Sequence, residues 1–297
     1  MSKVIFKDPA LQTAFETEGF VQIPLLQAED VAELRAMYQA YFPEPPEGFF
    51  SSSYLNDFDL KQEISGKVAA VIQRRLPEVL TNYRVFGSAF LSKTAGHRSE
   101  MPLHQDWSIV DESQYVAVNI WTPLQDVDAV NGSLEVLPGS HNFAPVRRSP
   151  TIPFFWEGYE AEMRQSLLGR TLKAGEAIVL NQALVHYSPA NTTPQNRLAI
   201  TTGALSAEAA MEFYYQSEPG ELEVFRMPDD FLLRFKDFHQ SIFERPTFGE
   251  PVGKVAYAHP VYPPEKVHAY LQSLRPAPEP VPAAPRKGFW ARLFSGK

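Results

Sequence analysis

The stretch "YVAVNIWTPLQDVDAVNGSLEVLPGS", residues 115–140, decides the predicted fold. It contains two short runs that suit strands, "YVAVNIWTPLQ" with β-branched and aromatic residues and "GSLEVLPGS" with Leu and Val, separated by Asp and Asn residues that are typical of turns. Similar short runs recur through residues 83–205 without helical patterns between them. This spacing is typical of a sandwich or barrel and not of a doubly wound sheet. We therefore predict a mainly β protein whose barrel core covers about residues 83–205.

The part of the chain before the barrel, residues 8–76, is predicted to be largely helical. Pro9 stands where the first turn of a helix tolerates proline, and Gly19 stands where a helix would end. Residues 27–42 follow with an apolar stripe at helical spacing, and another helix is predicted over about residues 60–76. These helices are expected to flank the barrel.

Three segments follow the barrel in the sequence. Residues 206–274 are rich in aromatic side chains and are expected to add a helix and loops, completing a single domain over residues 1–274. Residues 275–286 form a proline-rich linker, which cannot pack a core. Residues 287–297 form a basic amphipathic tail, and residues 286–297 are expected to dock weakly on a membrane surface or a partner protein. The alternative is that the tail folds back onto its own acidic domain.

The composition excludes several classes of function. The formal net charge of −8 repels phosphate backbones, so a nucleic acid partner is not expected. The chain has no Cys, so a metal site would have to use His, Asp or Glu. No apolar stretch suits a signal peptide or a membrane span, which makes a cytoplasmic location the expectation, with peripheral membrane contact through the tail as an option.

The segment "PLHQDW", residues 102–107, has the spacing of half a metal site. In an extended segment His104 and Asp106 point to the same side, so an imidazole and a carboxylate can converge on one ion. A non-haem Fe(II) oxygenase site needs two His and one carboxylate, with the opposite positions open. The third ligand must come from another strand, and His186, between two predicted strands, has the best context.

An anion site is predicted beside this metal site. Arg197 opens the predicted strand "RLAITTG", and a buried Arg needs an anion because an unpaired buried charge is very costly. A dicarboxylate would supply that anion in the bidentate geometry that Arg prefers. Ser188 points the same way as His186 if their segment is extended.

In this order, "PLHQDW", "NIWTPLQDVDAVNGSLEVLPGSH" and "AGEAIVLNQALVHYSPANTTPQNR" resemble the phytanoyl-CoA dioxygenase-like family of Fe(II)/2-oxoglutarate-dependent oxygenases. The resemblance covers about residues 10–205. It implies a double-stranded β-helix, a jelly-roll or cupin-like barrel, that uses Fe(II), 2-oxoglutarate and O2. It implies these site residues: His104, Asp106 and His186 as iron ligands, and Arg197, Ser188, Gln105, Trp121 and Phe90 around 2-oxoglutarate. It implies no catalytic side chain beyond the metal ligands.

The reaction and the substrate follow less directly. Halogenating relatives replace the carboxylate ligand with a small residue, so Asp106 favours hydroxylation or a related oxidation of a C–H bond, with release of succinate and CO2. The segment "TIPFFWEGYE", residues 151–160, could be an aromatic lid over a small, amphiphilic substrate, or equally a loop packed on the barrel. The expected pocket residues are Phe154, Phe155, Trp156 and Trp107.

Two other functions stay open at this point. One is a non-catalytic jelly-roll protein that binds a ligand or a metal, which would leave Arg197 and Ser188 unexplained. The other is a cupin-type isomerase that uses Mn or Zn, although such enzymes usually bring more His ligands to the metal.

Overall fold

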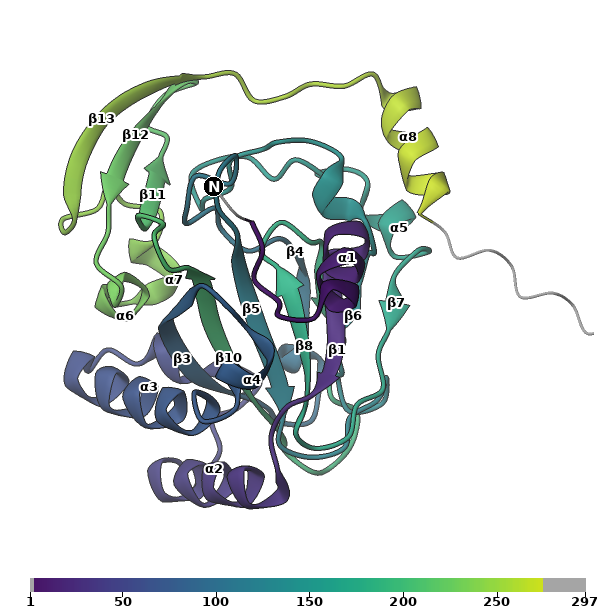
Figure 1. The fold of residues 1–297 in the computed structure, drawn as a ribbon, viewed down its shortest axis with the longest axis vertical. Coiled ribbons are helices and arrows are strands. Elements are labelled where there is room, and N and C mark those ends of the chain that lie inside the picture. Colours follow the sequence, from purple (N-terminus) through teal and green to yellow (C-terminus); the bar gives the residue numbers. More distant parts are fainter. Residues whose placement is uncertain (1–2, 275–297) are drawn as a thin grey trace, which may run out of the picture.

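A computed structural model describes residues 3–274, so the predicted linker and the basic tail lie outside the described residues (Figure 1). The barrel is made of two antiparallel sheets. The larger sheet has the strand order β1-β8-β5-β10-β3-β2. Its strands are β1 (Phe20–Pro24), β2 (Phe49–Ser51), β3 (Tyr83–Lys93), β5 (Ala117–Pro123), β8 (Glu176–Asn181) and β10 (Arg197–Ser206). The smaller sheet has the order β4-β9-β6-β7, with β4 (Met101–His104), β6 (Glu135–Val136), β7 (Leu168–Gly169) and β9 (His186–Ser188).

The chain alternates between the two sheets from β3 to β10. Strands β3, β5, β8 and β10 lie in the larger sheet, whereas β4, the pair β6 and β7, and β9 lie in the smaller one. This alternation is the topology of a double-stranded β-helix, so the prediction of a mainly β jelly-roll barrel is confirmed. The stretch that opened the sequence analysis provides β5 and β6, one strand for each sheet.

The two faces of the larger sheet have different partners. On one face Trp121, Ile178 and Ala199 pack against Leu134 and Val136 of the smaller-sheet side, and this cluster fills the barrel. The other face packs against the N-terminal helices α1 (Pro9–Glu18), α2 (Ala28–Tyr41), α3 (Phe58–Ile72) and α4 (Leu76–Val79). Figure 1 shows α2 and α3 stacked below the barrel on this side. Both faces are therefore apolar, which explains the near-continuous hydrophobic runs of these strands.

The helices begin and end where the local signals predict. The Asp8 carboxylate accepts a hydrogen bond from the Ala10 N–H at 2.8 Å, and Gly19 ends α1 with a φ of 82°. The third predicted helix is shorter than expected, because α3 ends at Ile72 and α4 follows as a separate turn.

Residues 206–274 contain more strand than predicted. They form a third sheet, β11-β12-β13, and three short helices as well as loops. The elements are β11 (Glu212–Tyr215), β12 (Gly220–Arg226), α6 (Phe231–Arg234), α7 (Phe238–Ser241), β13 (Glu250–Tyr257) and α8 (Pro264–Ser273). Figure 1 shows α6 and α7 between this sheet and α3, and α8 on the opposite side of the barrel near α5 (Glu160–Met163).

Within residues 3–274, none of the helices combines the length and the apolar character needed to cross a bilayer.

Candidate metal centre

The structure brings His104, Asp106 and His186 together at one end of the smaller sheet. His104 ends β4 and His186 begins β9, and the two are direct partners in this antiparallel pair. Their ring centroids are 4.1 Å apart. The Asp106 Oδ1 atom lies 3.9 Å from His104 Nε2 and 4.0 Å from His186 Nε2. The three potential ligand atoms lie within 4.8 Å of one another, so a single ion could bind all three.

Backbone carbonyls orient both imidazoles. The His104 Nδ1 atom is 2.7 Å from the Pro102 carbonyl oxygen, and the His186 Nδ1 atom is 2.9 Å from the Leu184 carbonyl oxygen. Because a carbonyl can only accept, each Nδ1 carries the proton and each Nε2 presents a lone pair toward the centre. Burial, with a smaller contribution from His186, lowers the pKa of His104 to about 4. The imidazole is therefore neutral at neutral pH, as a metal ligand must be.

Asp106 is held from two sides. Its Oδ2 atom accepts a hydrogen bond from Asn119 Nδ2 at 3.2 Å, and the Asn119 side chain accepts one from Thr201. Arg148 Nε donates to the backbone carbonyl of Asp106 at 2.8 Å and is itself paired with Glu112. The Oδ1 atom stays directed at the two imidazoles. Two His and one oriented carboxylate fit an octahedral ion with open positions for other ligands.

Two buried basic side chains lie side by side on neighbouring strands of the barrel. Arg197 and Lys93 are direct partners on β10 and β3, and both are almost completely shielded from solvent. The Nε and Nη1 atoms of Arg197 have no hydrogen-bond partner, and its guanidinium lies 5.5 Å from the ring centroid of Trp121. Burial lowers the pKa of Arg197 to about 9. Burial, reinforced by Arg197, lowers the pKa of Lys93 to about 6.

Neither cation forms an ion pair with a carboxylate of residues 3–274. Lys93 instead donates to the backbone carbonyls of Ser188 at 2.8 Å and Pro189 at 2.6 Å. Buried charges without a counter-ion are unfavourable, so this part of the barrel fits an anionic ligand.

Lys93 was not among the predicted site residues, because Phe90, on the opposite face of β3, was chosen instead. The prediction placed Phe90 in the cosubstrate pocket, but this is wrong. Phe90 points to the helices, where its ring centroid is 5.5 Å from that of Tyr38. Because side chains alternate along a strand, Lys93 shares the barrel face with Leu91. The antiparallel register with Arg197 is the signal that could have identified it.

The other predicted cosubstrate residues surround the same region. The Ser188 hydroxyl donates to the Gly132 carbonyl at 2.9 Å. Gln105 donates to the Ala183 carbonyl, and its Oε1 atom has no partner. Trp121 is buried in the barrel beside Arg197. Contact of these three residues with 2-oxoglutarate stays a prediction.

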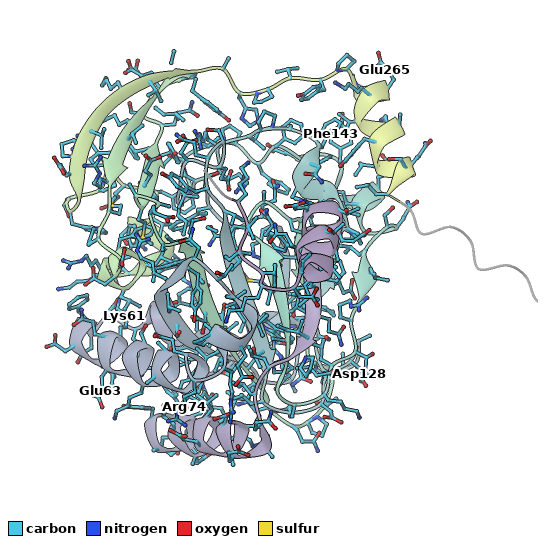
Figure 2. The ribbon with its side chains drawn as sticks, viewed as in Figure 1. Lys61, Glu63, Arg74, Asp128, Phe143 and Glu265 are labelled. Atoms are coloured by element: carbon cyan, nitrogen blue, oxygen red, sulfur yellow. The ribbon has the colours of Figure 1, made fainter. Side chains whose placement is uncertain are left out.

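A cavity of about 560 Å³ opens beside the metal ligands, and Trp107 is one of its walls, as predicted. The predicted aromatic lid is wrong. Phe154, Phe155 and Trp156 do not line this cavity but form an aromatic cluster with Phe143 (labelled in Figure 2), and Trp156 is only 1% exposed. Val267 and Leu271 of α8 pack against this cluster, so the segment is a loop packed on the barrel, the alternative reading.

Comparison with known proteins gives a family match. The model of the family described as phytanoyl-CoA dioxygenase (PhyH) matches residues 47–199. The chain is 31% identical over 128 residues to a phytanoyl-CoA dioxygenase domain-containing protein 1 homolog of Dictyostelium discoideum, covering 40% of this chain and 46% of that protein. It is 28% identical over 156 residues to a phytanoyl-CoA dioxygenase of Arabidopsis thaliana, covering 51% and 52%. The chain thus spans about half the length of the curated relatives it matches.

Solved structures support the fold. The carbocyclase SnoK from nogalamycin biosynthesis matches with a TM-score of 0.52 and 20% identity, covering 69% of this chain and 86% of that one. The epimerase SnoN, in complex with Fe3+, alpha ketoglutarate and nogalamycin RO, matches with a TM-score of 0.50 and 22% identity, covering 69% and 87%. At these identities the likeness concerns the fold alone.

Proposed function

The chain belongs to the phytanoyl-CoA dioxygenase family, whose model matches residues 47–199 of its 297 residues, and from this premise we propose that it is an Fe(II)- and 2-oxoglutarate-dependent dioxygenase. It would oxidise a C–H bond of a small molecule and release succinate and CO2. The observation that carries this proposal is the position of a His-Asp-His centre beside a buried Arg197 that lacks an anion. The solved relative SnoN, whose complex contains Fe3+ and alpha ketoglutarate, supports it.

His104, Asp106 and His186 would hold the metal, and their geometry fits this role. When bound, Fe(II) would supply the redox chemistry that couples decarboxylation of 2-oxoglutarate to oxidation of the substrate by O2. The two imidazoles arrive with Nε2 already directed at the centre, and Asn119 fixes the carboxylate. The protein therefore needs little rearrangement to bind the ion.

Arg197 and Lys93 would bind the distal carboxylate of 2-oxoglutarate. The Thr201 hydroxyl donates to Asn119, which in turn donates to the proposed metal ligand Asp106. Arg197 lies four residues before Thr201 on β10, so the two Cα atoms are about 13 Å apart. If the long Arg197 side chain extends toward the metal ligands, the remaining distance matches the length of 2-oxoglutarate, a five-carbon dicarboxylate. Trp121, beside Arg197, excludes water from the same region. Exclusion of water strengthens the charge pair between the guanidinium and the carboxylate.

The alternatives are less consistent with the cations. A cupin-type isomerase with Mn or Zn would use the three ligands but would leave Arg197 and Lys93 without an anion. A non-catalytic protein that binds only a metal would leave Arg197 without a role, and it predicts no turnover of 2-oxoglutarate.

The test is formation of succinate from 2-oxoglutarate. The protein would be loaded anaerobically with Fe(II) and 2-oxoglutarate and then exposed to O2, with succinate measured by mass spectrometry. We expect slow, O2-dependent succinate formation even without substrate, and faster formation with a suitable substrate. A protein that binds neither Fe(II) nor 2-oxoglutarate would contradict the proposal and favour the non-catalytic alternative.

Binding of 2-oxoglutarate is expected to take up about one proton at pH 7.5. The pKa of Lys93 is about 6 without ligand, so its amine is mostly neutral at this pH. A carboxylate placed beside it raises that pKa, and the amine takes a proton from the buffer. Calorimetric titration of anaerobic, Mn(II)-loaded protein in buffers of different ionisation enthalpy measures this uptake. The uptake should vanish near pH 5, where Lys93 is already charged, and in Lys93→Met. Equal uptake by wild type and Lys93→Met would contradict it.

A further inference from the structure

Starting from the proposed function, we infer that the substrate group entering the cavity beside the metal ligands is uncharged and largely apolar. We further infer that residues 229–242, outside the matched family region, determine which group fits.

The floor of the cavity is made of small residues on the barrel face of β3 and β10. Gly87, Ala89 and Gly203 lie there, on the face that also carries Thr201. A Cβ atom added to Gly87 would have no heavy atom within 4 Å, so this position faces open space. At Gly203 the ring of Phe86, another wall of the cavity, covers the strand, so the open space lies over Gly87, where a larger side chain would fill it.

The roof of the cavity is aromatic and aliphatic. Phe238 of α7 is central to it. Its ring is parallel to that of Trp107 to within 3°, with the centroids 6.1 Å apart, and lies 4.7 Å from the ring of Tyr54. Leu232 and Ile242 continue the same apolar wall on either side. A flat or branched apolar group would be in contact with carbon atoms on most sides.

The roof is anchored to the helical layer by one buried and two exposed hydrogen bonds. The Lys61 amine, on the buried side of α3 (labelled in Figure 2), donates to the Phe235 carbonyl at 2.7 Å. Asn56 forms two hydrogen bonds with Asp237, through its amide to the carboxylate at 2.9 Å and through its carbonyl oxygen from the Asp237 N–H at 2.8 Å. A lysine amine removed from water needs a hydrogen-bond acceptor, and the Phe235 carbonyl provides it. Moving the loop would break this bond, so the contact holds the loop in one position. The roof is thus a built wall of the site.

The cavity has few partners for a charged group. Among the described residues that line it there is no Lys or Arg, and its two histidines are His104, assigned to the metal, and the exposed His239, whose ring packs 4.7 Å from that of Tyr54. Its two carboxylates are Asp106, assigned to the metal, and Glu100, which lies 3.4 Å from Arg164. An anionic group would be desolvated with no Lys or Arg to pair with and only the exposed His239 nearby, and a cationic group would compete with the existing partners of the two carboxylates. Hydroxyl groups of a substrate could still bond to Tyr54, whose pKa burial raises to about 12, so that its phenol stays neutral.

The volume sets the size of the group. A cavity of about 560 Å³ lies within the range of about 300–1,000 Å³ typical of sites for drug-sized molecules. The inference concerns the part of the substrate that enters this cavity.

The test is binding of an uncharged fluorescent probe, N-phenyl-1-naphthylamine, to the metal-free full-length protein. Displacement of the probe would be compared for 2-naphthalenemethanol and 2-naphthoate, which differ mainly in charge. We expect the alcohol to displace the probe at a concentration at least about tenfold lower than the carboxylate. Equal or stronger displacement by 2-naphthoate would overturn the inference about charge. Stronger displacement by 2-naphthalenemethylamine than by the alcohol would overturn it in favour of a cation.

Matched glycine variants test whether the probe binds in this cavity. Gly87→Leu fills the cavity and should weaken probe binding by about tenfold or more, whereas Gly66→Leu, on the exposed side of α3, should not change it. Phe238→Ala removes the centre of the roof and should also weaken binding, which provides a second test if Gly87→Leu fails to fold. Unchanged affinity in a folded Gly87→Leu or Phe238→Ala protein would overturn the assignment to this cavity. Because binding needs neither iron nor 2-oxoglutarate, this result is independent of succinate formation.

Discussion

Replacing His186 with alanine is expected to abolish succinate formation and to lower metal affinity by more than about 100-fold. Substitution of residues that only orient metal ligands already costs about 10–100-fold, and His186 is proposed as a ligand itself. The side chain is buried, and its Nδ1 is fixed by the Leu184 carbonyl, so no neighbouring group can replace the lost Nε2. Anaerobic titration with Fe(II) or Co(II), followed by the succinate assay, measures both effects.

The matched control is His97→Ala, which removes an exposed histidine from the short η2 turn (His97–Ser99). It should leave metal affinity and succinate formation unchanged. Thermal unfolding of both metal-free variants separates loss of a ligand from loss of the fold. A folded His186→Ala protein with wild-type metal affinity would contradict the His104-Asp106-His186 centre.

Replacing Arg197 with methionine is expected to have opposite effects on binding and on stability. The affinity for 2-oxoglutarate should fall by about 30-fold or more, because loss of one partner of a buried charge pair costs about 2–5 kcal/mol. Metal affinity should stay the same, since Arg197 does not contact the ligands. The ligand-free protein should become more stable by about 1–4 kcal/mol, because the lost cation has no counter-ion there. Urea unfolding with and without 2-oxoglutarate measures these changes.

Arg197→Lys is the informative companion variant. It keeps the charge but loses the forked geometry for a carboxylate, so we expect intermediate affinity for 2-oxoglutarate and no gain in stability. If Arg197→Met instead destabilised the ligand-free protein and left 2-oxoglutarate binding intact, Arg197 would be a structural residue with an internal partner.

Much of the barrel and of the metal centre could be predicted from the sequence. The short β-rich runs over residues 83–205 predicted the barrel, because alternating and apolar patterns follow from how strands are buried. The spacing of His104 and Asp106 placed two ligands on one side of an extended segment. The context of His186 and of Arg197 at predicted strand ends, and then the resemblance to a known family, added these two residues; the structure brings His186 to His104 and Asp106, and pairs Arg197 with Lys93 on neighbouring strands of the barrel.

The faces of β3 and the location of the aromatic side chains were decided only by the tertiary structure. Strand side chains alternate with a period of two, so a change of one residue exchanges the two faces of a strand. Both faces of β3 are buried here, one in the barrel and one under the helices, and apolar composition could not distinguish Phe90 from Leu91.

Composition also could not show which aromatic side chains line the cavity beside the metal ligands. An aromatic side chain suits a core and a substrate cavity equally well, and its partner in the fold decides which one it joins. Residues 154–156 pack beneath α8, about 110 residues later in the chain, whereas Phe238 lines a cavity together with His104 and Asp106, more than 130 residues earlier. Local sequence thus determined which strands form and which residues can bind a metal. Long-range packing alone determined which side chains line the cavity, because those contacts join segments that no local pattern links.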